Sequence, residues 1–178
     1  MTAARRYLPS YVVSDYAQWE GDWELWDGVP VSMAPSPFGR HSAIASRLIV
    51  QLSNAIEAAG CNAEVLNEID WIVDEQNVVR PDVVVVCDGI PPRHVESAPT
   101  LAAEVISDAT ADRDRTFKRN LYRDQGVNHY LILDPNTNEM IWGRLVNGKW
   151  CEEQMAEPFD LLLCEDCQIQ LIPSRIFR

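Results

Sequence analysis

Two acidic residues stand within strongly apolar segments of this sequence. Asp82 opens the run VVVV after Pro81, and Glu104 interrupts the run LAAEVIS. A buried carboxylate is costly unless it is paired, protonated or bound to a cation. One divalent cation would satisfy both residues if their strands were neighbours, and carboxylate oxygens suit Mg²⁺ or Mn²⁺. Asp82 and Glu104 therefore predict a metal site at one edge of a sheet.

A metal site of this kind suits phosphodiester hydrolysis. The cation can polarise a phosphoryl oxygen and lower the pKa of a bound water. A nearby lysine would orient that water and offset the charge that develops in the transition state. Lys118 is the only lysine between Gly89 and Asn147, and it lies four residues after Asp114, on the same face of an expected helix.

Each of these residues also has an explanation without catalysis. Asp82 could form a local turn after the proline. Glu104 could be the buried partner of an arginine such as Arg113, an ion pair that can persist without a catalytic role. Lys118 could be an ordinary solvated helix residue.

Further polar residues fall near the expected elements. Asp27 suits a turn, and Glu24 could approach the site from the same segment. Glu68 is expected to be an exposed strand residue that could add a further acid. His41 is expected to start a helix, with a structural or substrate-contact role possible.

The apolar pattern predicts the elements that must position these residues. We expect a short helix at 11–20, a hairpin at 23–33 that turns at Asp27–Gly28, and an amphipathic helix at 41–59 that ends at Gly60. Strands are expected at 63–74, 76–88, 101–107 and 128–135, a helix at 112–126 with Phe117, Leu121 and Tyr122 on its buried side, and a hairpin that turns at Asn147–Gly148. This order predicts an α/β fold in which a mixed β-sheet is flanked by α-helices, with hairpins towards both ends. No composition break divides the chain, so we expect one domain over residues 1–178.

Composition and charge limit the classes of function. No apolar run of about 18 residues is present, and the first residues lack the apolar core of a secretory signal, so we expect a cytoplasmic protein that does not cross a membrane. Five cysteines at irregular spacing suit reduced thiols better than a disulfide framework. Cys164 and Cys167 have zinc or redox spacing, but no second pair supports a zinc site.

The net charge of -12 argues against a protein-wide basic face for nucleic acid. Any such face must be local, and the densest group of cations is Arg113, Arg115, Lys118, Arg119 and Arg123. The same segment also reads as a solvated helix face with ion pairs to Asp112, Asp114 and Asp124, and charge pattern alone favours this second interpretation.

The residues that predict chemistry also carry a resemblance. Pro81–Asp82 followed by an acid on the next strand resembles the signature of the PD-(D/E)XK nuclease superfamily, except that Ile106 stands where its lysine would be. Some members supply this lysine from the following helix, which implies Lys118 here. More closely, the chain resembles the bacterial Uma-two family of restriction-endonuclease-like proteins over about residues 23–145. The segments that carry this resemblance are WELWDGVPV, the helix start at His41, RPDVVVVCD, AAEVISDATADRDRTFKRNLYRDQGV and HYLILDP.

The resemblance implies a restriction-endonuclease-like fold with a site formed by Asp82, Glu104 and Lys118. We accordingly expect a cytoplasmic bacterial DNA endonuclease in which Asp82 and Glu104 bind Mg²⁺ or Mn²⁺. A homodimer is expected because a small nuclease must reach two strands to break a duplex. The alternative is an inactive nuclease-fold module that binds nucleic acid or protein, which the net charge and the missing in-strand lysine favour.

Overall fold

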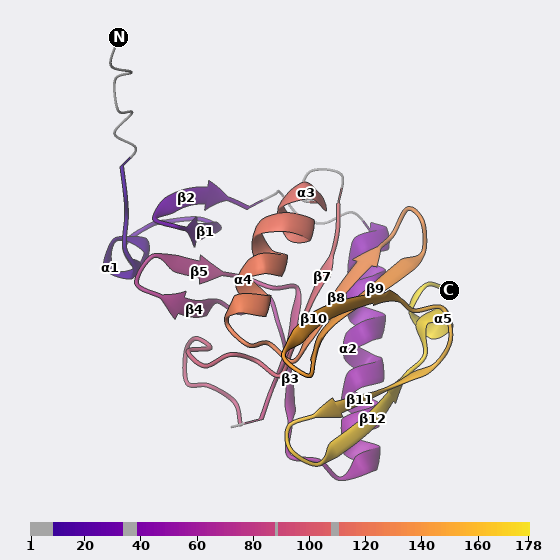
Figure 1. The fold of residues 1–178 in the computed structure, drawn as a ribbon. Coiled ribbons are helices and arrows are strands. Elements are labelled where there is room, and N and C mark those ends of the chain that lie inside the picture. The colour runs from indigo at the N-terminus through magenta and orange to yellow at the C-terminus, as the bar shows by residue number, and fades with distance from the viewer. Residues whose placement is uncertain (1–8, 34–38, 88, 108–110) are drawn as a thin grey trace.

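The computed structural model describes residues 9–33, 39–87, 89–107 and 111–178. It is a mixed α/β structure with three sheets (Figure 1). The helical elements are α1 (Val13–Tyr16), α2 (Gly39–Ala59), α3 (Ala111–Arg113), the π-helical turn η1 (Asp114–Lys118), α4 (Arg119–Asp124) and α5 (Pro173–Ile176). The strands are β1 (Trp23–Trp26), β2 (Val29–Ser32), β3 (Glu64–Asn67), β4 (Trp71–Asp74), β5 (Asn77–Val79), β6 (Val83–Val86), β7 (Leu101–Val105), β8 (His129–Asp134), β9 (Glu139–Val146), β10 (Lys149–Gln154), β11 (Phe159–Leu163) and β12 (Cys167–Leu171).

The largest sheet has six strands in the order β10-β9-β8-β7-β6-β3. Strands β7 and β8 are parallel and the other neighbours are antiparallel, so the sheet is mixed, as the sequence predicts. Every residue of β6 and β7 is buried, because α2 covers one face of the sheet and the segment α3–η1–α4 lies on the other (Figure 1). This arrangement explains why both strands read as continuous apolar runs.

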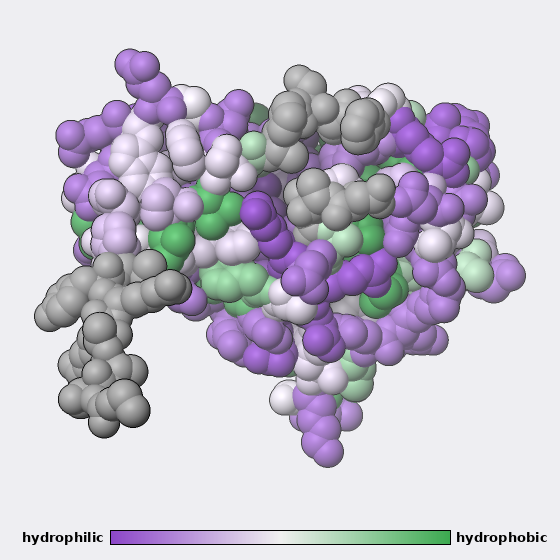
Figure 2. All heavy atoms as spheres, turned by 90° about the horizontal axis from the view of Figure 1, so that it is seen from above, coloured by the Kyte–Doolittle hydropathy of each residue, from purple (hydrophilic) through white to green (hydrophobic). Residues whose placement is uncertain are grey.

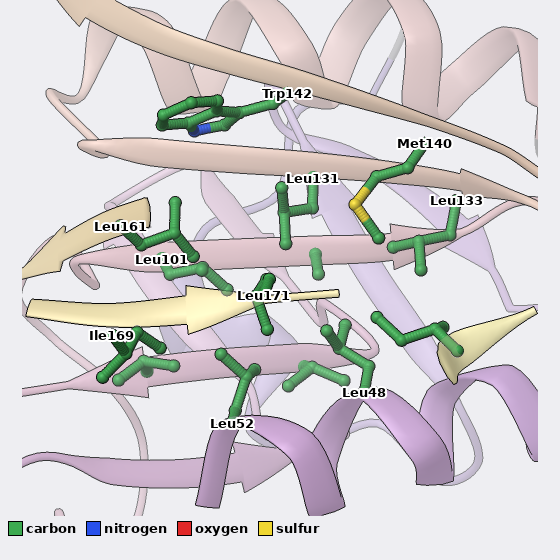
Figure 3. Close-up of a cluster of buried hydrophobic side chains, with 14 of the residues drawn as sticks. Leu48, Leu52, Leu101, Leu131, Leu133, Met140, Trp142, Leu161, Ile169 and Leu171 are labelled. Atoms are coloured by element: carbon green, nitrogen blue, oxygen red, sulfur yellow. The ribbon is translucent and has the colours of Figure 1, made fainter. Parts of the chain in front are cut away.

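Helix α2 supplies one side of the main core. Its buried residues Ile44, Leu48, Leu52 and Ile56 recur at the predicted helical spacing, and Gly60 follows with a positive φ of 68°. In Figure 3, Leu48 and Leu52 point from the helix towards the leucines of the central strands. Within the described ranges, no helix is long and apolar enough to span a membrane.

The two hairpin turns predicted from the sequence are confirmed. Asp27 and Gly28 have φ values of 48° and 76°, and Asn147 and Gly148 have values of 51° and 74°. Two consecutive positive φ angles are characteristic of the type I′ turn that joins antiparallel strands with their natural twist. The first turn connects β1 to β2, and the second connects β9 to β10.

Two segments expected to be single strands are each divided between sheets. Residues 63–74 form β3 in the six-stranded sheet and β4 in a four-stranded sheet ordered β2-β1-β5-β4. Residues 76–88 are divided in the same way, because β5 ends at Val79 and β6 begins at Val83. The breaks occur where Glu68 adopts a positive φ of 48° and where Pro81 lacks an amide donor for the ladder. The expectation that each of these segments forms a single strand of the mixed sheet is therefore wrong, and the helix expected at 11–20 is reduced to α1.

The C-terminal hairpin β11–β12 is absent from the sequence interpretation. It contributes Leu161, Ile169 and Leu171 to the core beside α2 (Figure 3). Its burial pattern alternates strictly, with one residue buried and the next exposed in both strands. Such alternation is the expected pattern for a sheet with one face on the core.

Two disulfides attach this hairpin to the rest of the molecule. Cys61 is bonded to Cys167 and Cys87 to Cys164, so each cysteine of the CxxC pair has a distant partner. The expectation of reduced thiols is wrong for these four residues. Cys151 is an exposed free thiol.

Candidate active site

Asp82 immediately precedes β6, and Glu104 lies in the neighbouring strand β7. The antiparallel register pairs Val83 with Ala103, and continuing it by one residue sets Asp82 opposite Glu104. The Val105 amide donates a hydrogen bond of 2.7 Å to Asp82 Oδ2, which holds this carboxylate against the end of β7. The end of β7 and the start of α2 lie at the upper end of the molecule in Figure 1. Figure 2 looks onto this end, where hydrophilic side chains predominate with smaller hydrophobic areas between them.

Glu104 is a buried carboxylate whose hydrogen bonds come from two side chains. Its exposed fraction is 3%. Lys118 Nζ lies 3.0 Å from Glu104 Oε1, and the Tyr122 hydroxyl donates to the same oxygen at 2.8 Å. Burial raises the pKa of Glu104 well above its usual value, although the Lys118 charge opposes this shift. Tyr122 is fully buried and therefore belongs to the site as the partner of Glu104.

Lys118 points its amine at the carboxylates and away from solvent. It comes from the π-helical turn η1, a rare geometry that is frequent at functional sites. Besides Glu104, its Nζ lies 3.0 Å from Glu24 Oε1 and 3.8 Å from Asp114 Oδ1. Burial alone would lower the pKa of Lys118, but the three carboxylates raise that pKa by more than burial lowers it. The pKa of Lys118 is therefore above its usual value, and the amine stays protonated. The orientation expected from the sequence is therefore present, and the catalytic role stays a prediction.

Glu24, which the sequence suggests only as a residue that could approach the site, lies within it. It is 4% exposed, and the Arg80 amide donates to its Oε1 at 2.6 Å. The Arg80 guanidinium is itself held by Asp70 at 2.7 Å and by Asp22 at 2.8 Å. The available signal is the one that identifies Glu104, an acid flanked by large apolar residues within a strand.

The carboxylates outnumber the amine around which they gather. Glu24, Glu104 and Asp114 would give three negative charges against the one positive charge of Lys118, an excess of two negative charges if all were ionised. An excess of buried negative charge is stabilised by a shared proton or by a bound cation. The raised pKa of Glu104 is consistent with the first of these in the absence of a cation.

His41 lies on the other side of Asp82, in the first turn of α2. Its Nε2 is 3.4 Å from Asp82 Oδ2. Burial lowers the pKa of His41, but the Asp82 carboxylate, the Val105 carbonyl and the Glu68 charge together raise it above its usual value.

A small cavity of about 100 Å³ borders these residues and is lined by His41, Ser42, Ala45, Ser46, Ile49, Asn67, Glu68 and Asp82. The exposed Glu68 thus contributes to the surroundings of Asp82 from the residue after β3.

The cationic segment is largely neutralised by neighbouring acids. Arg115 pairs with Asp134 at 3.1 Å, Arg123 with Asp124 at 2.7 Å, and Arg119 with Glu152. The guanidinium of Arg113 lies 5.7 Å from the ring centre of Trp26, so the suggested pair of Arg113 with Glu104 is wrong. The ion-paired interpretation therefore describes most of this segment.

The donor set of the site is suited to a hard divalent cation. Asp82 and Glu104 offer carboxylate oxygens from adjacent strands, which are ligands that Mg²⁺ and Mn²⁺ prefer. In the part of the chain that the structure describes, no three His, Cys, Asp or Glu side chains are grouped as a ready metal cluster. A cation held here would therefore need a side chain to reorient.

Comparisons with known proteins agree with this architecture. A solved structure of a protein from Anabaena variabilis, described as "a putative nuclease belonging to DUF820", superposes with a TM-score of 0.75 over 93% of this chain and 97% of the other, at 15% identity. An uncharacterized protein of Synechocystis, slr1290, is 29% identical over 154 residues, which cover 80% of this chain and 79% of the relative. The model of the Uma2 family, described as "Putative restriction endonuclease", matches residues 13–171. The chain therefore belongs to the Uma2 family.

Proposed function

We propose that the protein is a metal-dependent DNA endonuclease whose six-stranded sheet forms a restriction-endonuclease-like core. The observation that carries this proposal is the buried contact of Lys118 with Glu104, made beside Asp82 on the neighbouring strand. Burying the Lys118 ammonium group among carboxylates lowers stability, and a solvent-exposed lysine on the helix would avoid this desolvation cost. Such an arrangement is typical of a functional site.

The residues have distinct roles in this proposal. Asp82 and Glu104 hold Mg²⁺ or Mn²⁺, which would supply Lewis-acid polarisation of the phosphodiester and a more acidic bound water. Lys118 orients the attacking water through its amine and offsets the negative charge that develops on the phosphate. Tyr122 and Glu24 fix the positions of Glu104 and Lys118 through the hydrogen bond and the ion pair described above.

Cleavage assays with matched variants test the proposal. Purified protein is incubated with plasmid DNA, single-stranded DNA and RNA, each with Mg²⁺ or Mn²⁺. We expect DNA cleavage by the unchanged protein and by Lys149→Met, which alters an exposed lysine, and loss of at least about 100-fold in Asp82→Ala and Lys118→Met. Cleavage that persists in Asp82→Ala would show that another nuclease or another site is responsible.

A binding module without cleavage is the second candidate. The ion pairs of Arg115, Arg119 and Arg123 and the net charge of -12 favour it, since both weaken attraction to a nucleic acid backbone. Binding of DNA that does not depend on Asp82, without any cleavage in Mg²⁺ or Mn²⁺, would favour this candidate over the first.

We also propose that the enzyme acts as a homodimer, because one compact site of this size reaches one strand of a duplex. Sedimentation equilibrium in the presence of DNA and Mg²⁺ tests this point. A species of about 40 kDa, twice the 20.2 kDa of one chain, is expected, and a monomer at all concentrations would contradict the proposal.

A further inference from the structure

The contact between His41 and Asp82 has an unusual length for a hydrogen bond. The distance from His41 Nε2 to Asp82 Oδ2 is 3.4 Å. Ordinary N–H···O hydrogen bonds span about 2.7–3.2 Å, and Asp82 Oδ2 already accepts the Val105 amide at 2.7 Å. The imidazole therefore faces a carboxylate oxygen without forming a close hydrogen bond with it.

The same distance fits two ligands of one cation. Metal–ligand bonds of about 2.1 Å that meet at about 90–110° separate their two donor atoms by about 3.0–3.4 Å. His41 Nε2 and Asp82 Oδ2 could thus form one edge of a coordination polyhedron with little movement.

The groups around the His41 imidazole are consistent with a ring whose Nε2 is directed at Asp82. His41 Nδ1 is buried and has no hydrogen-bond partner among the described residues. The polar groups that act on the imidazole are therefore the Asp82 carboxylate, which faces Nε2, and the Val105 carbonyl. The adjacent cavity of about 100 Å³, whose lining is partly polar and partly apolar, has room for water at positions that protein ligands leave open.

We propose that His41 is the third protein ligand of the cation, together with Asp82 and Glu104. This inference rests on the metal dependence proposed above and narrows the class of metal. An imidazole beside two carboxylates favours Mn²⁺ over Mg²⁺, because Mg²⁺ prefers oxygen ligands alone.

The hydrogen bonds to Glu104 from Lys118 and Tyr122 both end on Oε1, so Oε2 is the oxygen assigned to the cation. The His41–Asp82 edge is preformed, and Glu104 completes the site by reorienting when the cation enters.

Manganese binding to the full chain tests the proposal without reference to activity. Mn²⁺ affinity is measured by calorimetry and by continuous-wave electron paramagnetic resonance, and nitrogen coordination by the ¹⁴N coupling in pulsed spectra. Asp82→Asn and His41→Gln are compared with the matched control His94→Gln, whose imidazole lies 3.9 Å from Asp70 instead. We expect ¹⁴N coupling in the unchanged protein and in His94→Gln, and its loss in His41→Gln. Mn²⁺ affinity should fall at least about tenfold in His41→Gln, with a smaller change for Mg²⁺.

The spectrum of the unchanged protein is decisive even if His41→Gln fails to fold. The chain has three histidines, and His129 has both ring nitrogens engaged, one with the Trp142 indole and the other with the Leu162 carbonyl. A ¹⁴N signal that remains in His94→Gln therefore points to His41.

The possible failures can be told apart. Mn²⁺ binding that requires Asp82 but shows no ¹⁴N coupling overturns the role of His41 and leaves the metal-dependent nuclease intact. Coupling that persists in a folded His41→Gln protein also overturns it. Absence of Mn²⁺ binding, or binding that Asp82→Asn does not weaken, overturns both this inference and the metal dependence of the proposed function.

Discussion

Lys118 Nζ lies 3.0 Å from Oε1 of Glu104 and 3.0 Å from Oε1 of Glu24. None of the three residues exposes more than 4% of its surface. One ammonium group thus joins β7 of the six-stranded sheet to β1 of the four-stranded sheet. The contact connects the two sheets at the site and also places the positive charge of the Lys118 ammonium group there.

Replacement of Lys118 by Met should destabilise the protein. Removing one partner of a buried pair leaves uncompensated charges, at a cost of about 3–5 kcal/mol. We expect urea unfolding to show a loss of this size for Lys118→Met and a change within about 0.5 kcal/mol for the exposed control Lys149→Met. Adding Glu104→Gln to Lys118→Met should recover part of the loss, because it removes a buried carboxyl group that no longer has a cationic partner. Equal stability of the two lysine variants would show that the buried pair contributes nothing.

Replacement of Glu104 by Gln should change how stability depends on pH. The folded pKa of Glu104 lies well above the ordinary value of 4.5, chiefly because of burial. Above pH 4.5 the native state therefore holds more protons than the unfolded state, and the free energy of unfolding falls as pH rises towards the folded pKa. Gln keeps an oxygen for the Tyr122 hydroxyl and removes the titration. We expect Glu104→Gln to lose less stability than the unchanged protein between about pH 5 and pH 8, as measured by thermal unfolding. Parallel pH profiles for the two proteins would contradict this expectation.

The sequence predicts those site residues whose positions are determined by residues nearby in the chain. Glu104 breaks a short apolar run, and Asp114 and Lys118 share a helical face, so their positions depend on neighbours a few residues away. Glu24 becomes buried only because β1 pairs with β5, where Leu25 lies opposite Val78. Trp23 and Leu25 give Glu24 the same kind of apolar flanks as Glu104. Those flanks do not reveal a partner strand about 50 residues away, so the burial of Glu24 cannot be read from its own segment.

The division of strands at Glu68 and Pro81 has a similar explanation. Both flanks of each break are apolar, so periodicity alone reads each segment as one strand. Glutamate is not a residue type that favours the positive φ found at Glu68, so its identity gives no signal of the break. Cysteine pairing is equally non-local, since the bonded residues are separated by 106 and 77 positions and connectivity cannot be deduced from spacing.

The disulfides should make a large contribution to stability. Closing a loop of about 100 residues restricts the unfolded chain by about 4–5 kcal/mol in the chain-entropy model. We expect one reactive thiol in the native protein, from Cys151, and five after reduction under denaturing conditions. The melting temperature should fall on reduction, and likewise in Cys61→Ser and in Cys87→Ser.

The exposed thiol provides the control for these measurements. Cys151→Ser should leave the melting temperature unchanged and remove the reactive thiol of the native protein. Five reactive thiols in the native protein would contradict the pairing of Cys61 with Cys167 and of Cys87 with Cys164.

His129 should make the protein less stable in mild acid. It is 8% exposed, its Nδ1 accepts the indole N–H of Trp142 at 3.2 Å, and its Nε2 then donates to the Leu162 carbonyl at 2.9 Å. Burial lowers the pKa of His129 below 6.5, although the hydrogen bond to Leu162 opposes this shift and the Arg144 charge adds to it. The unfolded state therefore binds more protons below pH 6.5. The stability due to neutral His129 is present above that pH and is lost as pH falls through the folded pKa.

This effect runs opposite to that of Glu104 over the same pH range, so it is best measured in the Glu104→Gln background. There we expect the free energy of unfolding to fall as pH decreases from about 6.5, and adding His129→Gln should flatten this slope even if it lowers stability at every pH. His94→Gln is the matched control, because it removes an imidazole whose side chain is one-third exposed. An undiminished slope in His129→Gln would mean that other groups take up the protons. Nuclear magnetic resonance titration of the His129 ring would then locate its pKa directly, and a value at or above 6.5 would show that burial does not control the protonation of this residue.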